Sequence, residues 1–122
     1  MPDAPVLLIG TYRMPPDAVL FERQSSQMTD FVAANEPGAL AFATYVDSER
    51  SEVATVMVHR DATSLLHHFE VAAELIEQGS RMVQMVGINV YGTLPPAVVD
   101  GLRRESKGWP VDIKEPIRGF TR

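Results

Sequence analysis

The sequence predicts an α+β fold whose elements follow the order β-α-β-β-α-β. Short runs of apolar, β-forming residues alternate with longer stretches in which apolar residues recur at helical spacing. Proline, glycine and polar clusters separate these runs. The length of 122 residues fits a single domain. We divide this domain, residues 1–122, into a core of residues 6–94 and a C-terminal extension of residues 95–122.

The first strand and the first helix are separated by prolines. Residues 6–12 form an apolar, β-capable run that ends before Pro15 and Pro16. Pro16 suits the first turn of a helix, because that turn does not need its missing amide hydrogen. Helical spacing of apolar residues continues to about Asn35, where residues 35–38 (Asn-Glu-Pro-Gly) predict the end of the helix.

Residues 39–46 and 52–59 predict the second and third strands, which the polar loop between them joins as a hairpin. Asp61 suits the N-cap of a second helix. That helix has the clearest apolar stripe of the chain, formed by Leu65, Phe69, Ala72, Ala73 and Ile76.

Gly79 and Ser80 predict the end of the second helix, and residues 83–92 predict the fourth strand. The C-terminal extension contains a short helix up to about Arg104 and a possible edge strand at residues 111–114.

The composition narrows the classes of function. A net charge of −5 argues against nucleic acid as a partner, because such proteins carry a basic surface. The absence of cysteine excludes thiol nucleophiles, cysteine-bound zinc and iron–sulfur clusters. The N-terminal residues 1–5 lack a basic signal-peptide region, and no apolar run approaches a membrane span. We therefore expect a soluble, cytoplasmic protein.

The second and third strands predict a homodimer. Both faces of these strands are uncharged, whereas a sheet with one face in water alternates apolar and polar residues. Two helices cover only one face of a four-stranded sheet, so a second copy is expected on the other face. The alternative is that the C-terminal extension folds over this face within one chain.

In its element order and in residues 59–69 (HRDATSLLHHF), the chain resembles the antibiotic biosynthesis monooxygenase superfamily. Members often have an Asp that opens the second helix and a His seven residues later, and Asp61 and His68 match this spacing here. The resemblance covers residues 6–94. It implies a ferredoxin-like sandwich with an antiparallel sheet that forms a dimeric α+β barrel, with a small pocket between sheet and helices in each protomer.

The same resemblance implies cofactor-independent oxygenation of a small aromatic quinol or of an anthrone-like or other polyketide-like compound. Alternatives on this fold are a non-catalytic small-molecule-binding or stress-response domain, and an isomerase or cyclase that does not use O₂. The heme-degrading branch typically has an Asn on the first strand and a Trp in the second helix. This chain has neither, so heme degradation is not expected.

His68 is the predicted general base. It lies at the border of the apolar stripe on the helical wheel, where an imidazole half inside a pocket can take a proton near neutral pH. The alternative is a histidine that only packs at the edge of the core. His67 is expected in solvent. A metal bound by His59, Asp61 and His68 is not expected, because Asp61 is better explained as a helix cap.

Asn89 and Tyr91 on the fourth strand are the other predicted site residues. Together with Gly87 they share one face of the strand in strict alternation, which suggests space beside hydrogen-bonding groups. They are predicted to polarise the substrate, although packing explains them equally well. No phosphate loop or dinucleotide-binding turn is present, so no cofactor is expected.

Overall fold

The computed structural model describes residues 4–106 and 108–122. Residues 1–3, part of the segment in which we found no signal peptide, lie outside the described residues. Within these described residues, five strands and four helices follow one another: β1 (Val6–Arg13), α1 (Ala18–Asn35), β2 (Ala39–Asp47), β3 (Glu52–His59), α2 (Ala62–Val71), α3 (Ala73–Met82), β4 (Gln84–Tyr91), α4 (Pro96–Glu105) and β5 (Val111–Lys114).

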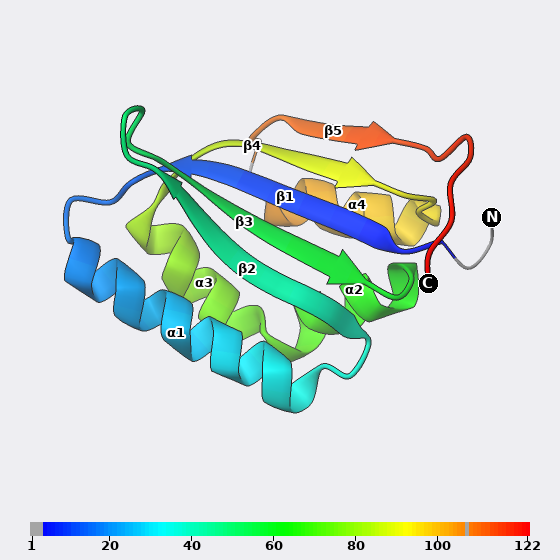
Figure 1. The fold of residues 1–122 in the computed structure, drawn as a ribbon, viewed down its shortest axis with the longest axis horizontal. Coiled ribbons are helices and arrows are strands. Elements are labelled where there is room, and N and C mark those ends of the chain that lie inside the picture. The colour runs from blue at the N-terminus through cyan, green and yellow to red at the C-terminus, as the bar shows by residue number, and fades with distance from the viewer. Residues whose placement is uncertain (1–3, 107) are drawn as a thin grey trace.

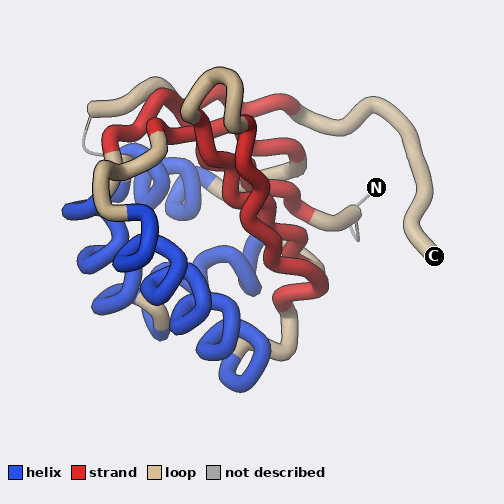
Figure 2. The backbone as a smooth tube through the Cα atoms, turned by 60° about the vertical axis from the view of Figure 1, so that its left-hand side comes forward, coloured by secondary structure: helices blue, strands red, loops and turns tan. Residues whose placement is uncertain are grey.

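The strands form one sheet in the order β2-β3-β1-β4-β5. The first four strands pair antiparallel, and β5 adds to β4 in parallel at the edge. The predicted α+β, ferredoxin-like fold is thus confirmed, and the C-terminal extension adds a fifth strand and a helix to it. All four helices lie on one side of the sheet (Figures 1 and 2).

The alternation along β1 defines the two faces of the sheet. Leu8, Gly10 and Tyr12 point toward the helices and line a cavity there. Leu7 and Ile9 point to the opposite, uncovered face, because successive strand residues face opposite sides. The partners of β1 in β3 and β4 share these orientations through the register of the sheet.

The helix termini follow capping chemistry. Helix α1 begins at Ala18, two residues later than Pro16, because the Asp17 side chain accepts a hydrogen bond from the amide of Leu20 at 2.9 Å. Asp61 caps α2 as predicted, accepting from the amide of Ser64 at 2.9 Å. Among residues 4–106 and 108–122, no helix is both long and apolar enough to cross a membrane.

The predicted second helix is two helices. It bends at Ala72, whose φ of −98° and ψ of 10° separate α2 from α3. Backbone hydrogen bonds continue through the bend, since the Ala72 amide donates to His68 and its carbonyl accepts from Ile76. The second half continues to Met82, past the predicted stop at Gly79.

A bulge in β4 changes the predicted faces of that strand. Thr11 pairs with Gly87, but the next residue of β1, Tyr12, pairs with Met85, so Val86 has no partner in β1. Met85 therefore lines the helix side together with Ile88. Strict alternation had grouped Met85 with Gly87 instead.

The interior between helices and sheet contains two separate clusters of buried side chains. One cluster, with Val6, Leu65 and Leu102, lies at the end of the sheet where β1 begins. The other, with Tyr12 and Phe21, lies where β1 ends. The space between the two clusters is the candidate site.

Candidate functional site

A cavity of about 190 Å³ lies between the sheet and the helices. Its lining is mainly apolar and rich in sulfur and aromatic rings, contributed by Met28, Met57, Met82, Met85, Phe21, Phe42, Phe69 and Trp109. A dry cavity of about 150 Å³ is known to hold one benzene molecule. The space therefore suits a small aromatic ligand.

Gly10 forms part of the cavity floor. It stands in a row across four strands with Thr44, Thr55 and Ile88, all of which line the cavity. A Cβ atom placed on Gly10 would meet nothing within 4 Å. A glycine inside a strand weakens the strand and often marks a close approach of a ligand. Here the missing side chain leaves the middle of the cavity open.

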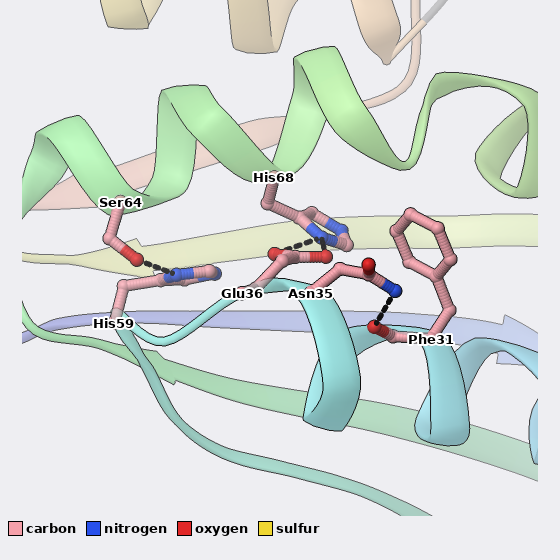
Figure 3. A network of polar contacts seen from close by, with 6 residues as sticks. All are labelled: Phe31, Asn35, Glu36, His59, Ser64 and His68. Carbon is pink, nitrogen blue, oxygen red and sulfur yellow. Dashed lines mark hydrogen bonds and ion pairs between the residues drawn. The ribbon is translucent and has the colours of Figure 1, made fainter.

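His68 and Glu36 form a buried pair at the edge of the cavity. Nδ1 of His68 lies 2.8 Å from both carboxylate oxygens of Glu36. Only 4% of His68 and 2% of Glu36 is exposed. Figure 3 shows the imidazole extending from α2 toward the carboxylate, which directly follows the last turn of α1.

The pair determines which ring nitrogen can react. An ionised carboxylate only accepts hydrogen bonds, so the neutral imidazole carries its proton on Nδ1. Nε2 then holds the free lone pair, and it has no hydrogen-bond partner among the described residues. Because His68 lines the cavity, Nε2 is the nitrogen available to a bound molecule. Such an arrangement orients a general base and stabilises the imidazolium formed when it takes a proton.

A second histidine lies beside this pair. The His59 ring is fully buried, 5.8 Å from the His68 ring between centroids, and its Nδ1 lies 2.8 Å from the hydroxyl of Ser64. Its Nε2 is buried without a hydrogen-bond partner in the described part of the chain. Burial, with a smaller contribution from His68, lowers the pKa of His59 from 6.5 to about 4, while Asp61 opposes this. His59 is therefore neutral at neutral pH.

The loop that carries Glu36 is held against α2 by a close contact. A Cβ on Gly38 would lie 2.5 Å from the hydroxyl oxygen of Ser64, so only glycine fits there. The carbonyl of Gly38 also accepts a hydrogen bond from the amide of Arg60. Pro37-Gly38, which we interpreted only as a stop signal, thus lets the loop approach the helix.

The three residues considered for a metal have other partners. Asp61 caps α2, His59 pairs with Ser64, and Nδ1 of His68 pairs with Glu36. Within residues 4–106 and 108–122, no group of three or more His, Cys, Asp or Glu side chains is arranged to hold a metal ion.

Asn89 and Tyr91 are separated from His68 by the sheet. They pair with Ile9 and Leu7, which lie on the uncovered face, whereas Ile88 between the two lines the cavity. Neither Asn89 nor Tyr91 lines the cavity. The Tyr91 ring instead lies 5.5 Å from the ammonium group of Lys114 on β5. The structure therefore does not bring these two predicted site residues together with His68.

Two contributions to the site were absent from the prediction. Glu36 gave no signal, because a glutamate in a polar turn is ordinarily exposed. The C-terminal extension closes part of the cavity with Leu102 and Glu105 at the end of α4 and with Trp109 before β5. The sequence predicted a short helix in this extension, but it did not indicate what that helix covers.

Known structures share this fold. MupZ from Pseudomonas fluorescens matches with a TM-score of 0.75 and 20% identity, over 97% of this chain and 94% of that chain. A Caulobacter crescentus protein provisionally named an antibiotic biosynthesis monooxygenase matches with a TM-score of 0.63 and 19% identity, over 73% of this chain and 89% of its own. A variant of SnoaB, a cofactor-independent oxygenase from Streptomyces nogalater, matches with a TM-score of 0.62 and 10% identity, over 70% of this chain and 89% of its own.

No protein-family model and no curated protein sequence matches this chain. At these identities the structural matches establish the fold, and they confirm the predicted resemblance to the antibiotic biosynthesis monooxygenases at that level. The match to MupZ covers 97% of this chain and so includes most of the C-terminal extension. The other two matches cover 73% and 70% of this chain, which is about the length of the segment from β1 to β4, residues 6–91.

Proposed function

We propose that this protein is a cofactor-independent monooxygenase of a small aromatic quinol or anthrone-like compound, with His68 as general base. The observation that carries the proposal is the buried Glu36–His68 pair on the wall of an otherwise mainly apolar cavity. A base oriented by a carboxylate and shielded from water is suited to remove a weakly acidic proton.

The first step is proton transfer to Nε2 of His68. The acidic hydrogen is a phenolic O–H in a quinol or a C–H next to the aromatic rings in an anthrone. The Glu36 carboxylate stabilises the imidazolium, as the carboxylate does in other carboxylate–histidine pairs. His59, held neutral by burial, adds no second positive charge next to it.

The second step uses the electron-rich anion as the reductant of O₂. In an anthrone, the deprotonated CH₂ carbon forms a bond to one oxygen atom of O₂. Loss of its second hydrogen and cleavage of the O–O bond turn this carbon into a carbonyl, and the second oxygen atom leaves as water with both hydrogens. The proton held by His68 returns to the departing oxygen. The mainly apolar lining protects the oxygenated intermediate from water.

Proton abstraction alone would also serve an isomerase or a cyclase, since the same pair can move a proton without O₂. A binding domain would need the cavity but not the base. Asn89 and Tyr91 receive no part in the step at His68, because the sheet lies between them and the cavity.

We also propose that the protein is a homodimer through the uncovered sheet face. The centre of this face is apolar, with Ile9, Val56 and Ala43 side by side on β1, β3 and β2. The C-terminal extension leaves the centre of this face open, since α4 lies on the helix side and β5 extends the sheet at its edge (Figure 1). The tail after β5 reaches Leu7 and Tyr91, at one end of the face. A second copy would bury this face.

The proton step can be tested without oxygen. Under anaerobic conditions in D₂O, the wild-type protein is expected to accelerate exchange of the acidic C–H protons of anthrone, measured by NMR. His68→Ala should lose this acceleration by about a hundredfold or more. His67→Ala, which changes an exposed neighbour on the same helix, is the matched control and should retain it. Equal exchange with His68→Ala would remove the base from the proposal.

A further inference from the structure

We propose that the hydroxyl groups of Tyr12 and Thr55 form a second polar subsite in the cavity, which donates one hydrogen bond to an acceptor oxygen of the ligand. The inference rests on the proposed function and narrows its substrate class. The ligand would carry an acidic group at His68 and an oxygen atom farther along the cavity, at Tyr12 and Thr55.

The two subsites lie apart along the cavity. His68 lies beside His59, which pairs with Val6 at the start of β1. Thr55 lies four residues from His59 on the same strand, about 13 Å at the usual rise of a strand. Tyr12 belongs to the buried cluster at the end of β1, away from the cluster that contains Val6.

The count of hydroxyl hydrogens shows that one donor is free. The Tyr12 and Thr55 oxygens are 2.5 Å apart, and either can donate to the other. Two hydroxyl groups carry two hydrogens, and this contact uses only one of them. Neither hydroxyl has another hydrogen-bond partner in residues 4–106 and 108–122. One O–H group is therefore left over among residues that line a mainly apolar cavity.

The surroundings keep this donor available. Burial raises the pKa of Tyr12 above its usual value of 10, although the hydrogen bond to Thr55 acts in the opposite direction. The phenol is therefore protonated at neutral pH. A hydroxyl that already accepts a hydrogen bond is a better donor, because neighbouring hydrogen bonds polarise one another. A ketone, phenol or quinol oxygen fits this donor, whereas an apolar end leaves it unsatisfied.

A matched pair of ligands tests the subsite. 1,4-Naphthalenediol carries oxygen atoms at both ends of one ring, and 1-naphthol lacks one of them. Anaerobic titration calorimetry of the wild-type protein is expected to show the diol binding about tenfold more tightly, which is the worth of about one hydrogen bond. The double variant Tyr12→Phe/Thr55→Val has no hydroxyl left and should bind the two compounds equally.

The single variants and a control make the result specific. Tyr12→Phe and Thr55→Val each leave one hydroxyl without its partner, so each should keep part of the preference for the diol. Thr29→Val makes the same isosteric change at an exposed site on α1, outside the cavity lining, and should keep all of it. Binding of 1-naphthol by the double variant would show that its cavity is intact. If the double variant does not bind 1-naphthol, the preference for the diol is judged from the two single variants.

Several results would overturn the subsite. These are no binding of the diol, equal affinity of the wild-type protein for both compounds, a full preference in the double or in both single variants, or an equal loss in Thr29→Val. The test is independent of the chemistry at His68, because both ligands carry an oxygen for that end. If the protein does not accelerate anthrone exchange but still prefers the diol, His68 is not the base and the subsite remains. If it accelerates exchange but does not prefer the diol, only the subsite is removed.

Discussion

Both carboxylate oxygens of Glu36 lie 2.8 Å from Nδ1 of His68, although 32 residues separate the two in the chain. Glu36 follows the end of α1, and His68 lies on α2, so the pair forms only when both helices pack on the same side of the sheet. Folding therefore assembles the proposed base, and a change at Glu36 should act through His68.

Glu36→Gln should lower kcat for proton abstraction by about a hundredfold or more, the usual contribution of a positioned general base. The amide still accepts the Nδ1 hydrogen bond, but it cannot balance the charge of the imidazolium. Steady-state kinetics and thermal unfolding would measure the two effects separately. Glu70→Gln, at an exposed site on α2, is the control. Unchanged kcat in Glu36→Gln would show that the pair has only a structural role.

Stability should fall as the pH is lowered from about 6.5 toward 4. The folded-state pKa of His59 is about 4, against 6.5 in the unfolded chain. Between these pH values the unfolded state binds a proton that the folded state does not, so acid favours unfolding. Over the whole range the free energy of unfolding falls by about 3 kcal/mol. Above pH 6.5 both states are neutral at this site, and the contribution is complete.

Urea unfolding of the wild-type protein and of His59→Gln at several pH values would measure this contribution. The variant should show a flatter dependence of the unfolding free energy between pH 6.5 and 4. His67→Gln, which changes an exposed histidine, should follow the wild-type curve. Identical slopes in wild type and His59→Gln would contradict the assignment to His59.

Gly10→Val should remove ligand binding without destabilising the fold. The new side chain enters open space in the cavity, and replacing a glycine within a strand commonly stabilises it by up to about 1 kcal/mol. Calorimetry with 1-naphthol and a thermal melt would show the two effects. Gly38→Ala is the contrasting change, since its Cβ would collide with Ser64 and lower the melting temperature. Undiminished binding by Gly10→Val would place the ligand elsewhere.

Val56→Asp should dissociate the proposed dimer and leave the protomer folded. Val56 lies at the centre of the uncovered face, between Ile9 and Ala43, where an unpaired carboxylate in an apolar interface costs several kcal/mol. Sedimentation should then show at least about a hundredfold weaker association. Val19→Asp, at a valine of α1 that is 68% exposed, should remain a dimer. A wild-type monomer at micromolar concentration would refute the dimer itself.

The fold was largely predictable because its signals are local. Apolar periodicity predicted the order of strands and helices, and the side chain of Asp61 predicted the start of α2. The bend at Ala72 was not predictable, since neither proline nor glycine marks it. The bulge at Val86 depends on pairing with β1, so no pattern within β4 itself reveals that Met85 turns toward the helices.

The site was less predictable because it depends on contacts between distant segments. Helical spacing placed His68 at the border of the core, and the structure buries it. Its partner Glu36 belongs to a turn that has no apolar pattern to indicate burial. Strict alternation suggested Asn89 and Tyr91 as neighbours of open space, but their orientation depended on which face the helices cover.

Oxygen consumption by the metal-free protein tests the central claim most directly. Wild type, His68→Ala and His67→Ala would be compared with an oxygen electrode against a panel of hydroquinones and anthrones. We expect uptake with at least one member of the panel, a loss of about a hundredfold or more in His68→Ala, and no change in His67→Ala. Uptake that is unchanged in His68→Ala, or no uptake across the whole panel, would contradict oxygenation driven by the Glu36–His68 pair.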